Sequence, residues 1–239
     1  MTHTYENLGR TNQNSMKYTC QYCKKDFVKE ASLAVHSCEP RRRRQEQNEA
    51  GVRLGFLAYI KFYELTQGSA RLKTFDDFAD SAYYRAFVRF GRYCVDIRAV
   101  NPARFVEWVL KQNKKIDHWC RDTVYTEYLI SYLQVENVND ALARAMEFGL
   151  DWNEKTGNPP EHCLRYGNTN SMVYAVTTGR VSPWVIYNSD AGQKFLSELD
   201  ASQVAMVWPY IDADIWQKKF RDYPADQEYA RDILQKAGW

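Results

Sequence analysis

Four residues of metal-binding type, close to the start of the chain, constrain its fold more than any other feature. Cys20 and Cys23 are separated by two residues, and a pair formed by His36 and Cys38 follows after twelve more. The Cys-x-x-Cys spacing lets two thiolates converge on one ion from a tight turn. Three thiolates and one imidazole are the soft and borderline ligands that Zn²⁺ prefers in tetrahedral sites. The sequence therefore predicts a zinc site, with Cys20, Cys23, His36 and Cys38 as ligands.

Apolar residues between these ligands complete a pattern. Phe27 lies four residues after Cys23, Leu33 six after Phe27, and His36 three after Leu33. With these positions, residues 18–38 resemble a single C2H2-type zinc finger in a C2HC variant. The resemblance implies a small ββα unit, with the cysteines on a hairpin and the histidine on a helix. About 22 residues bury too little apolar surface to fold alone, so the metal is expected to supply the folding energy.

The last ligand departs from the family pattern. The family places it four to six residues after the histidine, whereas Cys38 stands two residues after His36. Residues i and i+2 of an α-helix point about 200° apart, so both cannot reach one ion from a regular helix. We therefore expect the helix to end near His36 and the chain to turn back at Cys38, with Glu39-Pro40 as a stop.

Positive charge is concentrated in the finger and the segment after it. Residues 1–53 contain ten Lys and Arg against six Asp and Glu, whereas residues 54–239 contain 22 against 24. Cationic clusters of this kind hold phosphates and supply most non-specific affinity for nucleic acid. The residues predicted to contact DNA or RNA are Lys24, Lys25, Lys29, Arg41, Arg42, Arg43 and Arg44.

Two further features bear on what the finger binds. Tyr18 and Tyr22 offer ring faces on which unpaired bases could stack. The helix positions that read bases in DNA-binding fingers fall on Lys29, Ser32 and Val35, and only Lys29 is a strong base-edge donor. Sequence-specific reading by this finger alone is therefore not expected. An apolar side formed by Ala31, Ala34 and Val35 favours the alternative, in which the finger docks another protein.

The rest of the chain indicates a mostly α fold. We expect a flexible arm at 1–16, the finger at 17–38, a basic linker and helix start at 39–51, and an all-α multi-helix domain at 52–239. Helix starts are predicted by capping residues, and Gly68 predicts a stop. The capping residues are Thr74 with Asp77, Asn101 before Pro102, Asp122, Asn139, Ser182, Asp200 and Asp212. This remainder resembles uncharacterised proteins of large tailed bacteriophages, which would make the chain a viral protein in the host cytoplasm.

A few other residues carry groups that could bind metal or take part in catalysis. The pairs His118/Cys120 and His162/Cys163 could form a second metal site only if the fold brought them together. Asp212, Asp214 and Lys218 are better explained as charged residues of a solvated helix face than as nuclease residues. The chain contains no metalloprotease, phosphate-loop or serine-hydrolase motif, which favours a protein without catalytic activity. An enzyme hidden in the helical domain stays a third alternative.

The compartment follows from composition. No run of 18 apolar residues and no apolar leader is present, so neither a membrane span nor secretion is expected. The six cysteines are then expected to lie in a reducing, intracellular compartment, where clustered cysteines indicate metal binding rather than disulfides. The function predicted from the sequence is a non-catalytic zinc-finger protein that binds nucleic acid through phosphates, in regulation or replication. A structural or adaptor protein is the alternative.

Overall fold

The structure is a computed structural model that describes residues 17–68 and 72–239. The predicted flexible arm of residues 1–16 lies outside these described residues. A two-stranded antiparallel hairpin, β1 (Tyr18–Thr19) and β2 (Asp26–Phe27), pairs Tyr18 with Phe27 and precedes the first helix. Every described residue after the hairpin is helical or irregular, so the predicted mostly α fold with a small ββα finger is confirmed.

The α-helices follow one another along the chain with short connections. In the N-terminal half they are α1 (Glu30–Ala34), α2 (Glu39–Gln45), α3 (Ala50–Gln67), α4 (Phe75–Ala79), α5 (Tyr84–Asp96), α6 (Pro102–Lys111) and α7 (Asp122–Val135). In the C-terminal half they are α8 (Val138–Thr156), α9 (Cys163–Tyr166), α10 (Thr169–Thr177), α11 (Pro183–Asn188), α12 (Asp190–Ser197), α13 (Ala201–Ile211), α14 (Ala213–Asp222) and α15 (Pro224–Lys236). Short 3-10 turns at Glu46–Asn48, Ile116–His118 and Pro160–His162 complete the chain. No helix among the described residues combines the length and apolar character needed to cross a membrane.

Local capping explains many of the helix starts. The Thr74 hydroxyl accepts the Asp77 N–H at 3.2 Å while the Asp77 carboxylate accepts the Thr74 N–H, as the capping box predicts. Side chains of Asn101, Ser182, Asp200 and Asp212 also accept N–H groups at the starts of α6, α11, α13 and α14. Gly68 ends α3 with a φ of 56°, in the left-handed region that favours glycine.

Two predicted caps are placed differently in the structure. Asp122 is the first residue of α7 and not its cap, which is Arg121. The α8 cap is Asn137, whose side chain accepts the Asp140 N–H at 2.9 Å. That bond places Asn139 inside the first turn. Both differences are of one or two residues, because several polar residues near each helix start can play the same role.

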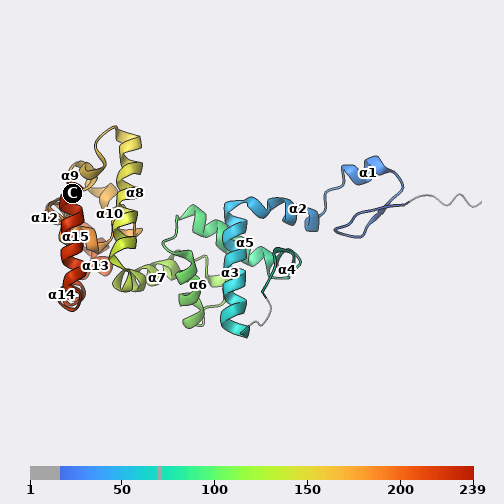
Figure 1. Ribbon diagram of the computed structural model, residues 1–239, viewed down its shortest axis with the longest axis horizontal. Coiled ribbons are helices and arrows are strands. Elements are labelled where there is room, and N and C mark those ends of the chain that lie inside the picture. Colours follow the sequence, from blue (N-terminus) through green and yellow to red (C-terminus); the bar gives the residue numbers. More distant parts are fainter. Residues whose placement is uncertain (1–16, 69–71) are drawn as a thin grey trace, which may run out of the picture.

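Buried apolar residues of the helical region form two clusters. The first runs from Val52 to Leu133 and is rich in rings, with Phe105 stacked on Tyr128 at 4.7 Å between centroids. The second runs from Val138 to Trp239 and is centred on the buried indole rings of Trp184 and Trp216. The partly buried Tyr210 packs against both clusters. In Figure 1 the two groups of helices lie side by side along an elongated molecule, with the finger at the opposite end from α8–α15.

A polar joint connects the two clusters where α7 ends. The Glu136 carboxylate is fully buried and accepts hydrogen bonds from two nitrogens of Arg144. The Glu136 carbonyl accepts bonds from the Trp184 indole N–H at 3.3 Å and from the Lys219 ammonium at 3.0 Å. Lys219 also donates to the Gln134 carbonyl at 2.8 Å, so it satisfies carbonyls that the end of a helix leaves free. Burial lowers the pKa of Lys219 to about 8.

Candidate metal centre and its basic surroundings

A tight turn between the two strands positions the first two ligands. The Cys20 N–H donates to the Lys25 carbonyl and the Lys24 N–H donates to the Cys20 carbonyl, both at 2.9 Å. Lys24 completes the turn with a φ of 60°, an uncommon conformation for a residue other than glycine. This backbone folds Cys20 and Cys23 onto the same side of the hairpin.

The second pair of ligands lies outside regular helix. Helix α1 ends at Ala34, and His36 follows it in an irregular segment. The Phe27 ring lies 4.7 Å from the His36 ring, and an Arg41 guanidinium nitrogen donates to the His36 carbonyl at 2.6 Å. The chain then turns at Cys38, so the predicted end of the helix near His36 is confirmed. In this chain the histidine follows the finger helix instead of lying on it.

Glu39-Pro40 starts a helix and does not stop one. Cys38 is the residue immediately before α2, and Pro40 occupies its first turn. Proline is tolerated there because the first N–H groups of a helix have no partner within the helix. The four arginines, Arg41 to Arg44, therefore lie in a helix, within the range predicted as a basic linker and helix start.

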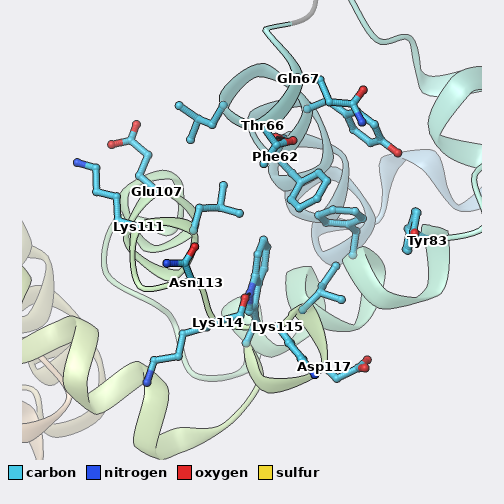
Figure 2. A pocket seen from close by; sticks show the side chains of 16 residues that line it. Phe62, Thr66, Gln67, Tyr83, Glu107, Lys111, Asn113, Lys114, Lys115 and Asp117 are labelled. Carbon is cyan, nitrogen blue, oxygen red and sulfur yellow. Dashed lines mark hydrogen bonds between the residues drawn. The ribbon is translucent and has the colours of Figure 1, made fainter.

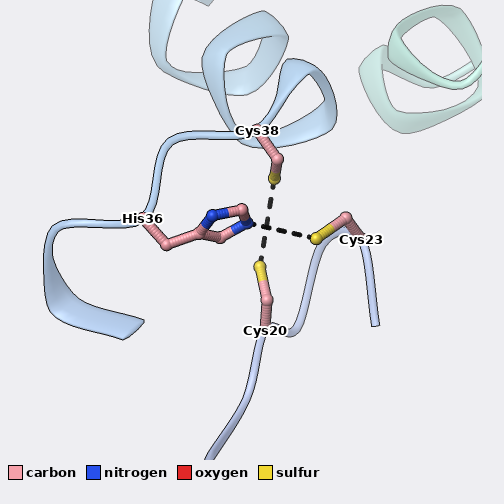
Figure 3. A group of neighbouring side chains, drawn as sticks. All are labelled: Cys20, Cys23, His36 and Cys38. Carbon is pink, nitrogen blue, oxygen red and sulfur yellow. Dashed lines mark hydrogen bonds between the residues drawn. The ribbon is translucent and has the colours of Figure 1, made fainter. Parts of the chain in front are cut away.

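The four side chains converge on one point (Figure 3). Their ligand atoms all lie within 4.8 Å of one another. The Cys20 and Cys38 sulfurs are 3.9 Å apart, close to the roughly 3.8 Å that two Zn–S bonds of about 2.3 Å give in a tetrahedron. The Cys23 sulfur lies 3.2 Å from His36 Nε2, slightly less than the roughly 3.5 Å of that geometry. The group can hold a metal ion, and its arrangement is consistent with a C2HC finger.

Backbone N–H groups near the sulfurs of Cys20 and Cys38 favour the thiolate forms of these residues. The N–H of Cys23, aided by that of Tyr22, lowers the pKa of the Cys20 thiol to about 7. Burial raises the pKa of the Cys38 thiol, and the N–H of Arg41 opposes that rise. Because metal binds thiolates, N–H groups aimed at sulfur favour the bound form.

The structure gives two of the four arginines several partners within the chain. Arg43 donates to the Ala79 carbonyl at 2.8 Å, and its guanidinium lies 4.6 Å from the centre of the Tyr84 ring. Arg44 pairs with Asp76 at 2.8 Å and Asp80 at 2.9 Å. These contacts attach α2 to α4 and to the start of α5.

The other predicted cations are freer. Arg42 is exposed and has only a weak pairing with Glu46, at 3.7 Å. Lys24, Lys25 and Lys29 are exposed on the finger, and within residues 17–68 and 72–239 no carboxylate lies at ion-pair distance from them. The Lys25 ammonium lies 5.6 Å from the centre of the Phe27 ring.

Two features near the centre were not predicted from the sequence. Glu39 accepts bonds from Arg43 at 2.6 Å and Arg85 at 2.9 Å, which lowers the pKa of its carboxyl group. The Arg44 guanidinium lies 5.7 Å from the centre of the Tyr22 ring and so links the finger to α2. The pairing of Arg44 with Asp76 and Asp80 could have been predicted in part, because two acidic residues four positions apart lie on one helix face and can pair with a cation.

The remaining candidates do not gather into a site. Among the described residues, the finger cluster is the one group of three or more His, Cys, Asp or Glu whose ligand atoms converge, so His118/Cys120 and His162/Cys163 do not come together. The Asp212 carboxylate accepts the N–H groups of Asp214 and Ile215 and caps α14. Comparison with protein-family models, curated proteins and solved structures found no match to this chain.

Proposed function

We propose that this chain is a non-catalytic, zinc-dependent protein that binds nucleic acid through phosphate contacts made by its finger, in a regulatory or replicative role. The observation that carries the proposal is the set of exposed lysines around the metal centre, Lys24, Lys25 and Lys29, which have no carboxylate partner among the described residues. Cationic side chains without a counter-charge in the protein can contact the phosphates of a nucleic-acid backbone.

Zinc is the metal that fits the cluster best. Three sulfurs and one imidazole nitrogen leave no open position in a tetrahedral shell, which is typical of structural zinc. The metal then holds the turn that carries Lys24 and Lys25 in a fixed shape. Phosphate binding should therefore depend on the metal, although the metal does not contact the phosphate.

The arginines divide into two roles in this proposal. Arg41 and Arg42 extend the cationic surface of the finger, whereas Arg43 and Arg44 mainly hold α2 against the helical region through Ala79, Asp76 and Asp80. Phosphate contact by all four arginines stays a prediction that substitution in pairs can test.

The test is fluorescence anisotropy with duplex and single-stranded oligonucleotides over a salt series. Each phosphate contact should contribute a log–log slope of about −0.9 on duplex DNA and about −0.7 on single strands. Changing Lys24, Lys25 and Lys29 together to Gln should reduce the slope by the amount that two to three phosphate contacts contribute. It should also weaken binding to all sequences alike. Changing Arg41 and Arg42 to Gln should flatten the slope further, and changing Arg43 and Arg44 should do so less.

The matched control is a pair of exposed lysines on distant helices. Lys155→Gln with Lys218→Gln removes charge from α8 and α14 and should leave the slope unchanged. Absence of binding by the wild-type protein at low salt, where electrostatic attraction is strongest, contradicts the proposal. So does an unchanged slope in the triple lysine variant.

A specific observation supports the adaptor alternative. Val35 is 84% exposed and Val28 76% exposed, and Ala31 and Ala34 are exposed beside them on the finger. An apolar patch on so small a unit is typical of a surface that another protein covers. If nucleic acid does not bind, Val35→Asp should weaken capture of the partner protein while leaving the metal content unchanged.

A further inference from the structure

A cavity of about 990 Å³ opens between the C-terminal turns of α3 and α6 and the start of α5, away from the finger (Figure 2). Its wall is mostly apolar, and side chains from α3, α5, α6 and the turn at Ile116–His118 contribute to it. Its apolar residues include Phe62, Leu65, Phe87, Leu110, Ile116 and Trp119. Cavities of about 300–1,000 Å³ with apolar walls and a few polar groups are the usual form of small-ligand sites.

Contacts within the protein fix the side chain of Trp119, which is part of the cavity wall. The Trp119 indole N–H donates to the Lys114 carbonyl at 2.9 Å, so the polar group of this buried ring has a hydrogen-bond partner. The Trp119 ring contacts Phe87 edge to face at 6.0 Å and Phe90 at 5.3 Å between centroids. Trp119 and Phe87 are almost completely buried, so this part of the wall is already fixed and a ligand need not order it. The surface that a ligand could cover belongs to more exposed wall residues such as Leu65 and Ile116.

Positive charge at the rim is not fully compensated. Glu107 is paired with Lys61 at 3.3 Å and Arg104 at 2.9 Å, both outside the cavity. Asp117 is paired in the same way, with Arg89 at 3.4 Å.

The rim lysines differ in whether they are paired. Lys114 has a carboxylate partner, Glu127, at 2.8 Å. Lys111 and Lys115 are exposed at the edge and have no carboxylate at ion-pair distance among the residues that the structure describes. The rim therefore offers two uncompensated cations, and Figure 2 shows their side chains pointing apart, on different sides of the apolar wall.

We propose that this cavity binds an amphipathic organic anion, with an aliphatic or flat aromatic body against the wall and its carboxylate or similar group at one of the two unpaired rim lysines, Lys111 or Lys115. The apolar wall supplies affinity in proportion to the area it buries. An unpaired ammonium group at the rim selects an anionic end over a neutral one of the same shape. The proposal does not depend on nucleic-acid binding by the finger, which lies on other elements.

The experiment uses the full chain with its metal and measures displacement of 8-anilinonaphthalene-1-sulfonate by dodecanoate and by dodecanol, both below their aggregation concentrations. Wild-type protein should bind dodecanoate more tightly than dodecanol. Changing Lys111 and Lys115 to Gln should weaken dodecanoate binding roughly ten-fold and leave dodecanol binding unchanged. Equal effects on both compounds would overturn the assignment of the anion to these lysines.

A matched pair of variants on one helix tests the place of binding. Leu65 and Leu57 are both exposed on α3, at 50% and 59%, but only Leu65 lines the cavity. Leu65→Glu should abolish dodecanoate binding, and Leu57→Glu should not alter it. Equal loss in both variants, or no displacement by dodecanoate at all, would overturn the proposal. The triple lysine variant of the finger should bind dodecanoate normally, so this test and the nucleic-acid test can fail separately.

Discussion

Each metal ligand must lose or lack a proton before it can bind zinc. The N–H groups facing the Cys20 sulfur favour its thiolate, and the hairpin turn places Cys23 beside it. His36 and Cys38 reach the same point only because α1 ends before them. Among the described residues only these four side chains converge, so a change at either cysteine of the hairpin removes one of four ligand atoms without a substitute nearby.

The purified wild-type chain should contain one zinc ion, measured by elemental analysis. The double variant Cys20→Ser, Cys23→Ser should contain none, because two ligands cannot hold zinc against exchange with solvent. Cys120→Ser, at a half-buried cysteine outside the cluster, is the control and should keep the metal. Zinc retained at full content by the double variant would contradict the assignment of the ligands.

At the residue scale, the sequence predicted the ligands but not their neighbours. The spacing of Cys20, Cys23, His36 and Cys38 is local, and metal chemistry restricts it strongly. The partners of Arg43 and Arg44 on α4 and at the start of α5 come 32 to 41 residues later in the chain. Periodicity and charge alone could not distinguish an arginine that packs on Tyr84 from one that faces solvent.

Helix α2 is the element whose role differs most from its prediction as a linker. Arg43 stacks on Tyr84 and donates to two carbonyls, whereas its neighbour Arg42 is exposed. The same residue type at adjacent positions thus has different surroundings. The sequence predicted a basic linker and helix start over residues 39–51, and the structure places a helix over residues 39–45 of that range.

Arg43→Ala should release α2 from the helical region, because the substitution removes the stacking on Tyr84 and leaves the Ala79 carbonyl without its donor. Amide hydrogen exchange across residues 39–45 should accelerate by about ten-fold or more, corresponding to a loss of about 1–3 kcal/mol. Arg42→Ala is the control and should change exchange little, since an exposed i,i+4 pair contributes about 0.2–0.5 kcal/mol. Equal effects of the two variants would show that α2 is held by other contacts.

Metal removal should act on the finger and spare the other elements. The finger contains a hairpin of two-residue strands and a five-residue helix, neither of which is stable alone. A chelator should therefore unfold residues 17–38 while far-UV circular dichroism keeps nearly all of its helical signal. A global loss of helix on chelation would mean that the finger and the helical region fold as one unit.

At the scale of the whole molecule, the sequence predicted an all-α region but not its division into two clusters. Capping residues such as Thr74 and Asp200 mark where helices begin, and apolar spacing marks which face is buried. Neither signal specifies which faces pack together. The joint at Glu136 could not be predicted from local signals, because its partners include Trp184 and Lys219, which are 48 and 83 residues away in the chain.

Glu136→Gln should destabilise the protein strongly, because it leaves the largely buried Arg144 guanidinium without its counter-charge. Breaking one side of a buried ion pair typically costs about 3–5 kcal/mol. The measurement is the urea midpoint followed by circular dichroism and by tryptophan fluorescence. Asp232→Asn, in an exposed pair with Lys236, is the matched acid-to-amide control and should shift the midpoint little. Similar midpoints for the two variants would contradict a structural role for the joint.

Cys38 belongs to the group that can hold a metal ion and also lies immediately before α2, and this has a consequence for how far the finger can reach. A metal bound by these side chains would close the chain from Cys20 to Cys38 into a ring immediately before α2. Without the metal, residues 17–37 would become a flexible segment ahead of Cys38, and 21 flexible residues span roughly 25 Å on average. Metal occupancy therefore sets the volume over which the lysines of the finger are spread, and so their local concentration at any phosphate surface.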